Sequence, residues 1–180
     1  MLSEQPKTQE TKKMRVFRID NRPFDVAGII TPQNQYQGQL DANRAIIEEI
    51  LEAHRPEDKP RRNEILMVFQ DFDNAKEHWT IQTNSKFYRA EIQDEAVLHR
   101  GDFNKIEELW ANRNDPERAA RIAGEYWDGI MTDNPKVEIF VASAPVTHVL
   151  SNNEQERKNA FRIRKKFEPI RGVRIINDID

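Results

Sequence analysis

Four short apolar runs, separated by charged segments, constrain the fold of this chain most. Residues 14–20 alternate between two faces, as a half-buried strand does. Residues 65–69 are apolar without alternation, which is typical of a strand covered on both faces. Residues 86–92 and 137–146 indicate two further strands, the last broken or bent at Pro145. Because helical patterns lie between these strands at uneven spacing, the order predicts an α+β fold and not a regular β-α-β array.

Helical patterns occupy most of the remaining chain. Residues 39–54 carry an apolar stripe at spacings of three and four. Asp73 is the expected cap of a short helix, and Asp102 is expected to open the next one. Asp115 followed by Pro116 indicates another helix start, a capping side chain before proline at the first helical position. We expect residues 99–102 to form a turn that leads into the helix after Asp102.

Composition places the chain among single-domain proteins without disulfides. At 180 residues, of which 37% are hydrophobic and 33% charged, it fits one core better than two thin ones. No apolar stretch approaches the roughly 20 residues that cross a bilayer, and the first residues do not resemble a secretory signal. The absence of cysteine excludes thiolate nucleophiles and cysteine-based zinc sites. We therefore expect a cytoplasmic protein without membrane contact.

Polarity divides the chain into three parts. Residues 1–13 hold too little apolar area to offset the ordering of their backbone, which predicts a disordered arm. Residues 14–151 form the folded domain, and residues 152–180 add a basic helix and a short strand at 173–176 to the same domain. On that helix, Ala160, Ile163 and Phe167 share one face.

The C-terminal part concentrates positive charge in a chain whose net charge is −3. Eight lysines and arginines lie between positions 157 and 174, against the single acid Glu168. Such a face can attract phosphates, or it can be a solvated face paired with acids elsewhere in the protein. If this face binds a macromolecule, the candidates for contact with it are Arg162, Lys165 and Lys166.

Most familiar catalytic signatures are missing. The chain has no glycine-rich phosphate loop, no His-Glu-x-x-His helix and no Gly-x-Ser-x-Gly elbow. Its four histidines show no ligand spacing, so we expect no metal cofactor. Glu48, Glu49 and Glu52 are expected on the solvated side of their helix, and Trp127 in the core.

A series of weak motifs runs through residues 14–150 in a specific order. In chain order, they are an aromatic residue followed by Arg18, Gly28-Ile29-Ile30-Thr31-Pro32 with Tyr36 downstream, Pro60-Arg61-Arg62-Asn63, Phe69-Gln70-Asp71-Phe72-Asp73-Asn74-Ala75, Phe87-Tyr88-Arg89-Ala90-Glu91, Tyr126-Trp127-Asp128-Gly129, and Glu138-Ile139-Phe140-Val141 with Pro145-Val146. This order resembles the small ADP-ribosyltransferases that modify rifampicin, and a related family of uncharacterised bacterial and phage domains.

The resemblance implies a fold and an activity. The fold would be a split pair of curved β-sheets with peripheral helices. The activity would be transfer of ADP-ribose from NAD, the co-substrate, to a macromolecular acceptor that is nucleic acid or protein. Some such enzymes act as bacterial or phage toxins or effectors and have a cognate inhibitor or antitoxin as a partner. Arg18 stands where the rifampicin enzymes have histidine, which resembles the Arg-Ser-Glu branch of the superfamily. Lys136 stands two residues before Glu138, where the enzymes that modify arginine have glutamine or glutamate, so the resemblance argues against arginine as the acceptor.

The resemblance also assigns roles to residues. Glu138 would be catalytic, because a carboxylate stabilises the positive charge that develops on the ribose as nicotinamide leaves. The NAD-binding group would be Arg18, Tyr36, Arg62, Asn63 and Phe69. Taken alone, Glu138 lies on the opposite strand face from its two apolar neighbours, so it points either to solvent or into a cleft. Arg18 alone could equally form a salt bridge at the edge of the core, and Phe69 could be a core aromatic.

Two other classes of function stay open at this point. The chain could be a nucleic-acid-binding protein without enzymatic activity, which the basic tail favours. It could also be a degenerate transferase fold that serves as an interaction module, because Asn63 is the nearest counterpart to the Ser or Thr of the second transferase motif. Hydrolysis of NAD by the purified protein would distinguish the enzyme from both.

Overall fold

The computed structural model describes residues 12–33 and 42–167. The strands are β1 (Lys13–Asp20), β2 (Ile29–Ile30), β3 (Leu66–Phe69), β4 (Lys86–Gln93), β5 (His99–Asp102), β6 (Val137–Val141) and β7 (Ala144–Ser151). The helices are α1 (Ala42–Ala53), α2 (Phe72–Ile81), α3 (Phe103–Asn112), α4 (Pro116–Trp127) and α5 (Glu154–Phe167), with a short 3₁₀ turn η2 (Asp94–Ala96). Residues 1–11 of the predicted arm, Tyr36 and the predicted strand at 173–176 lie outside the described residues. The prediction that the arm extends to residue 13 is wrong at its end, because Lys13 already pairs with β4 in β1.

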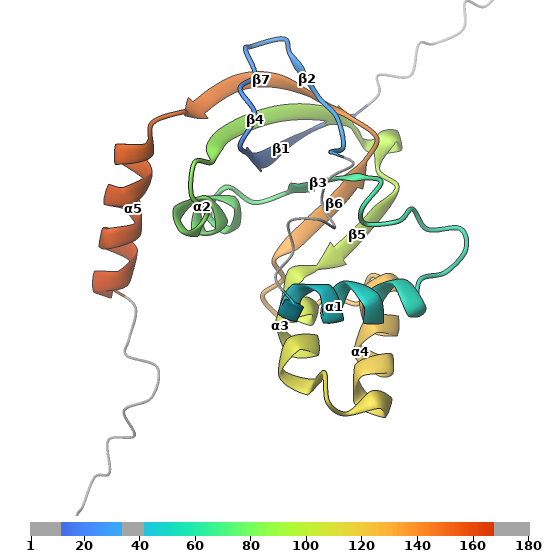
Figure 1. Cartoon of the computed structure of the whole chain (residues 1–180). Helices are drawn as coiled ribbons and strands as arrows, with labels where there is room; N and C mark the ends of the chain where they lie inside the picture. The colour runs from blue at the N-terminus through green and yellow to red at the C-terminus, as the bar shows by residue number, and fades with distance from the viewer. Residues whose placement is uncertain (1–11, 34–41, 168–180) are drawn as a thin grey trace, which may run out of the picture.

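The strands form one open, antiparallel sheet in the order β2-β7-β4-β1-β3-β6-β5. The α+β class predicted from the sequence is therefore confirmed. β1 pairs with β4 from Lys13↔Gln93 to Asp20↔Lys86, but with β3 at only one described position, Phe17↔Phe69. The sheet thus narrows between a strongly curved half, β2-β7-β4-β1, and a second half, β3-β6-β5 (Figure 1).

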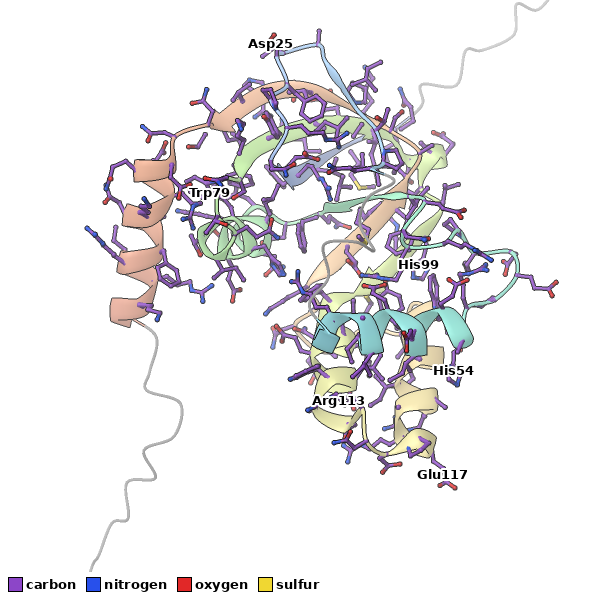
Figure 2. All side chains as sticks on the ribbon, in the orientation of Figure 1. Asp25, His54, Trp79, His99, Arg113 and Glu117 are labelled. Carbon is purple, nitrogen blue, oxygen red and sulfur yellow. The ribbon has the colours of Figure 1, made fainter. Side chains whose placement is uncertain are left out.

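Three apolar clusters hold the two halves and their helices. The first draws residues from both halves of the sheet and includes Val16, Val68 and Tyr88. In the second, α1, α3 and α4 pack beneath β5 and β6, with Trp127 at the centre, as the sequence predicts (Figure 1). The third joins α2 to β1 and β4 through Trp79, near α5 (Figure 2). Each fully buried large side chain contributes about 1.5–3 kcal/mol, so these clusters fix the position of the narrow junction.

Helix starts follow the sequence closely, with one correction. Asp102 and Asp115 cap α3 and α4 by accepting hydrogen bonds from the backbone N–H groups of Asn104 and Arg118. At α2, however, the cap is Asp71 and not Asp73. The chain leaves β3 in an extended conformation that a capping residue requires, so Asp71 accepts from the next turn while Asp73 is already helical.

Residues 99–102 form strand β5 and not the expected turn. They pair with β6 from His99↔Phe140 to Asp102↔Val137. This edge strand is stable because His99 packs among aromatic rings and Gly101 leaves room for a ring from α4.

The basic helix α5 packs on α2, but its apolar face is narrower than expected. Ala160 packs against the third cluster, whereas Ile163 is 61% exposed. Lys166 and Phe167 belong to the helix, and their side chains lie outside the described part. Among the helices that the structure describes, none is long and apolar enough to span a bilayer.

Candidate functional site

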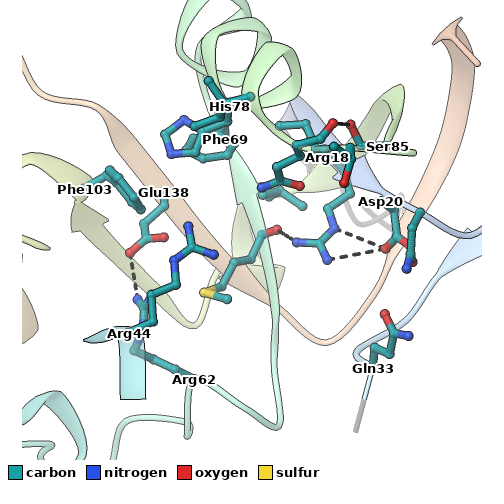
Figure 3. Close-up of a pocket in the computed structure, with 17 residues that line it drawn as sticks. Arg18, Asp20, Gln33, Arg44, Arg62, Phe69, His78, Ser85, Phe103 and Glu138 are labelled. Atoms are coloured by element: carbon teal, nitrogen blue, oxygen red, sulfur yellow. Dashed lines mark hydrogen bonds and ion pairs between the residues drawn. The ribbon is translucent and has the colours of Figure 1, made fainter. Parts of the chain in front are cut away.

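A cleft of about 450 Å³ lies at the narrow junction of the sheet, bordered by α2 and the start of α3. We call it the junction cleft. Its charged lining residues are Arg18, Asp20, Arg44, Arg62 and Glu138 (Figure 3). One wall is aromatic and is made of Phe69, His78 and Phe103. This volume lies in the range of small-molecule sites in proteins.

Glu138 is buried on the cleft side of β6, with 3% of its surface exposed. It lies opposite Phe69 of β3 and Gly101 of β5. Its Oε1 accepts a hydrogen bond from Arg62 Nη1 at 2.7 Å and another from the Tyr126 hydroxyl at 2.5 Å. Both contacts recorded among the described residues fall on Oε1, and the second oxygen points towards the centre of the cleft (Figure 3). Of the two orientations that the sequence allows, the structure has the one facing the cleft.

Arg62 connects Glu138 to helix α1. Its Nε donates to Glu48 Oε2 at 2.9 Å, and its guanidinium lies 5.3 Å from the ring centre of Tyr126. The expectation that Glu48 belongs to the solvated helix face is therefore wrong, because it neutralises a buried arginine. Since Arg62 is 6% exposed and lies between two carboxylates, much of its hydrogen-bonding capacity is used inside the protein.

Tyr126 reaches Glu138 because the residue beneath it is glycine. A Cβ built on Gly101 would lie 2.5 Å from Tyr126 Cε2 and 2.8 Å from its Cζ. Any other residue at 101 would push the ring off β5 and away from Glu138. Burial raises the pKa of the Tyr126 hydroxyl well above its usual value, so the group stays protonated and donates.

Arg18 spans the place where β1 and β3 stop pairing. Its Nη1 donates to the Met67 carbonyl at 2.7 Å, and its Nε and Nη2 lie 3.4 Å from Asp20 Oδ2. Arg22 Nη2 donates to the same oxygen at 2.8 Å. Burial alone would raise the pKa of Asp20, but the hydrogen bonds and charges of the two arginines hold it below its usual value. Arg18 therefore both forms a salt bridge at the edge of the core and lines the cleft.

The aromatic wall holds a histidine from α2. The His78 ring lies 4.6 Å from the Phe69 ring and 4.5 Å from Phe103, at 89° to the latter. Its Nδ1 lies 3.2 Å from the Asn74 carbonyl, which can only accept, so Nδ1 carries the proton. Burial lowers the pKa of His78, so the ring is neutral near pH 7 and its Nε2 is an acceptor.

Asp102 fixes the segment that leads into β6. Its two oxygens accept from Asn104 N at 3.0 Å, Lys136 N at 3.0 Å, Thr132 N at 2.9 Å and Thr132 Oγ1 at 2.6 Å. These hydrogen bonds keep the pKa of Asp102 below its usual value, against the opposing effect of burial. Glu138 follows Lys136 by two residues, so the same carboxylate sets where the strand of Glu138 begins.

The other predicted site residues lie at varying distances from this centre. Asn63 lines a recess of about 40 Å³, which shares Arg18 and Arg62 with the junction cleft. Arg162 and Lys165 are exposed on α5, which supplies none of the residues that line the cleft. In the described part of the chain neither forms an ion pair with an acid, whereas Arg157, Lys158 and Arg164 do.

Sequence reasoning missed several members of the site, although some left a signal. Arg44 lies one helical turn before Glu48 on α1 and lines the cleft. Tyr126 stands in the apolar stripe of α4, where a buried hydroxyl requires a partner. Gly101 and His78 carried no local pattern that indicates a site.

Comparison with known proteins adds no identification. No protein-family model matches the chain, and no curated protein matches it. Within residues 12–33 and 42–167, no group of three or more acidic or histidine side chains is arranged to hold a metal ion. The function must therefore be argued from the junction cleft.

Proposed function

We propose that this protein is an NAD-dependent ADP-ribosyltransferase with its active site in the junction cleft. The observation that carries the proposal is Glu138, a buried carboxylate with one oxygen held by Arg62 and Tyr126 and the other directed into the cleft. Arg18 comes to the same cleft from the other half of the sheet. The single-pair junction between β1 and β3 favours the split, curved arrangement of ADP-ribosyltransferases as the finer fold.

The chemistry of the cleft suits a sugar cation. When nicotinamide leaves NAD, positive charge develops on the ribose, and a fixed carboxylate stabilises it without reorganising. Glu138 would supply that charge, and Arg18 and Arg44 would attract the pyrophosphate. Phe69 offers an aromatic face to a flat ring of the substrate. Arg62 fits a positioning role better than direct NAD binding, because Glu48 and Glu138 already engage its guanidinium.

The acceptor is proposed to be a macromolecule that meets the basic helix. Arg162 and Lys165 are the exposed cations of α5 without an acidic partner among the described residues, and Lys166 follows them. α5 packs on α2, which borders the cleft, so a long acceptor could contact both. Nucleic acid fits this charge best, and an acidic protein is the alternative acceptor.

The decisive experiment measures nicotinamide release and label transfer from adenine-labelled NAD. The purified protein is incubated with NAD and a cell lysate, and the products are then digested separately with nuclease and protease to identify the acceptor. Glu138→Gln should lower release by about a hundred- to a thousand-fold, equal to about 3–4 kcal/mol of transition-state stabilisation. The matched control is Glu91→Gln on β4, which makes the same change outside the cleft and should leave the rate unchanged.

Stability must be measured beside activity. Because Glu138 is buried and paired, its replacement by glutamine should cost about 1–3 kcal/mol of unfolding free energy even though the amide can still accept from Tyr126. Rates are therefore compared per folded molecule. Normal release by Glu138→Gln, or no release by the wild-type protein, would contradict the proposal.

A non-enzymatic nucleic-acid-binding protein is the second candidate. Arg162 and Lys165, which have no acidic partner among the described residues, favour it, and it makes a different prediction for the same assay. Binding to nucleic acid that is salt-dependent and indifferent to NAD, with no nicotinamide released, would support this candidate instead.

A further inference from the structure

We propose that His78 is the general base of the junction cleft and accepts the proton of the acceptor group that attacks the sugar. This inference rests on the proposed transferase function and extends it to the class of acceptor. His78 belongs to no motif in the sequence, and its position becomes visible only when α2 is placed against β3 and α3.

The position of His78 is fixed on three sides. It is 8% exposed, and the rings of Phe69 and Phe103 hold its plane. The hydrogen bond from Nδ1 to the Asn74 carbonyl sets the tautomer and leaves the lone pair on Nε2. No described residue donates to Nε2, and Figure 3 shows the ring on the same side of the cleft as Glu138. With no described donor on it, Nε2 is available to accept a proton from a group in the cleft that His78 lines.

The other basic groups near the cleft are already engaged. Both oxygens of Asp20 accept hydrogen bonds from arginines. Glu138 is required to stabilise the sugar. Lys136 lies two residues before Glu138, and its ammonium group pairs with Glu77 at 3.8 Å and Glu107 at 3.3 Å, so it cannot take a proton. Among the residues that the structure describes, His78 is the group left for proton transfer.

The charges around His78 keep it suited to this role. Burial lowers its pKa below the ordinary 6.5, and the hydrogen bond to Asn74 opposes that effect. Of the charged groups that face it, Glu77 and Glu138 raise its pKa and Lys136 lowers it. The imidazole is therefore neutral near pH 7 and becomes protonated only in acid, so the base is available at physiological pH.

The step balances without any further reagent. The lone pair of a neutral O–H or N–H acceptor forms a bond to C1′ of the ribose, and the bond from C1′ to the nicotinamide nitrogen breaks. That bond's electron pair neutralises the pyridinium, so nicotinamide leaves uncharged. The acceptor proton passes to His78 Nε2 and then to solvent. A base is needed only when the attacking atom bears a proton, so His78 indicates a protic acceptor, such as a hydroxyl or a ring N–H of a nucleobase, and not a carboxylate.

Small nucleophiles test this without knowledge of the natural acceptor. Water and methanol each lose a proton when they attack NAD, whereas azide attacks as an anion and needs no base. His78→Phe keeps the ring contacts with Phe69 and Phe103 but has no basic nitrogen, and His78→Asn serves as a second variant. The control is His54→Asn, because His54 makes the same contact with a carbonyl four residues back, that of Ile50, but is exposed and outside the cleft.

We expect His78→Phe to lower hydrolysis and methanolysis by about a hundred- to ten-thousand-fold, while azide adduct forms within about threefold of the wild-type rate. In the wild-type protein, hydrolysis should fall in acid, as pH drops through the lowered pKa of His78, and azide transfer should not. Equal losses with all three nucleophiles, unchanged hydrolysis, or coinciding pH profiles in the wild-type protein would overturn the role of His78 and leave the transferase proposal standing. Absence of nicotinamide release from the wild-type protein would overturn both.

Discussion

Replacing Gly101 by alanine tests whether Tyr126 holds Glu138 in place. The new Cβ would lie 2.5 Å from Tyr126 Cε2, and ordinary contact begins at 3.4 Å, so the ring must retreat by about 0.9 Å. The ring cannot retreat easily, because it is buried and its centre lies 5.4 Å from the centre of the His99 ring and 5.2 Å from that of the Trp127 ring. The backbone of β5 is tied to β6 by strand pairing and cannot easily move instead.

The size of the effect follows from two contributions. Forcing a methyl group into a filled core costs about 1–3 kcal/mol. A ring shift of about 0.9 Å also stretches the 2.5 Å hydrogen bond between Tyr126 and Glu138 to about 3.4 Å, which loses most of a charged hydrogen bond worth about 1.5–3 kcal/mol. Partial relaxation will reduce the sum, so we expect Gly101→Ala to lower the free energy of unfolding by about 2–4 kcal/mol.

Gly124→Ala is the matched control. Gly124 lies on α4, two residues before Tyr126, and a Cβ there would meet nothing within 4 Å. Since alanine is the better helix former, this change should raise the free energy of unfolding by about 0.5–1 kcal/mol. Urea denaturation followed by circular dichroism measures both variants, with equal slopes as the sign that only stability has changed.

Two outcomes would refute this account of the site. One is a neutral or stabilising effect of Gly101→Ala, which would mean that the ring moves freely. The other is an unfolding loss without any change in nicotinamide release per folded molecule, which would mean that the hydroxyl of Tyr126 does not position Glu138.

Two further predictions concern buried titratable groups. Burial, with a smaller effect from the charge of Lys59, lowers the pKa of His99 to about 4, whereas the unfolded chain keeps a value near 6.5. The free energy of unfolding should therefore fall by up to about 3 kcal/mol as pH drops from 6.5 towards 4. The melting temperature of His99→Phe should depend less on pH than that of the wild-type protein over this range. Asp102→Asn should cost about 2–4 kcal/mol in urea denaturation because an amide nitrogen cannot accept from Thr132, whereas Asp115→Asn, at an exposed helix cap, should stay within about 0.5 kcal/mol; equal effects at the two caps would contradict this.

Local patterns in the sequence were enough to predict most elements. Alternation located β1, the unbroken apolar run located β3, and Asp115 with Pro116 located the start of α4. These signals depend on neighbours within a few residues. The cap predicted at Asp73 in place of Asp71 and the turn predicted at 99–102 in place of β5 show the limit, because both positions depend on how the chain is arranged in three dimensions.

The site could be predicted only in part, for the same reason. Glu138 and Arg18 stand inside apolar strands, where a charged residue is conspicuous. The partners of Glu138 come from positions 62 and 126, and the sequence contains no local relation between them. Gly101 is needed only because one ring from α4 crosses β5 at that point. Such requirements arise from packing and leave no periodic signal.

The narrow junction explains why so many charges can be buried in one small region. Where β1 stops pairing with β3, backbone groups lose their ladder partners, and Arg18 takes the place of a strand by donating to the Met67 carbonyl. Asp20 then balances Arg18, as Glu138 and Glu48 balance Arg62. Arg18, one of the charges that line the cleft, therefore also links the two halves of the sheet. It follows that substitutions in the cleft will change stability and activity together, and a transition-state role can be assigned only when rates are divided by the folded fraction measured under the same conditions.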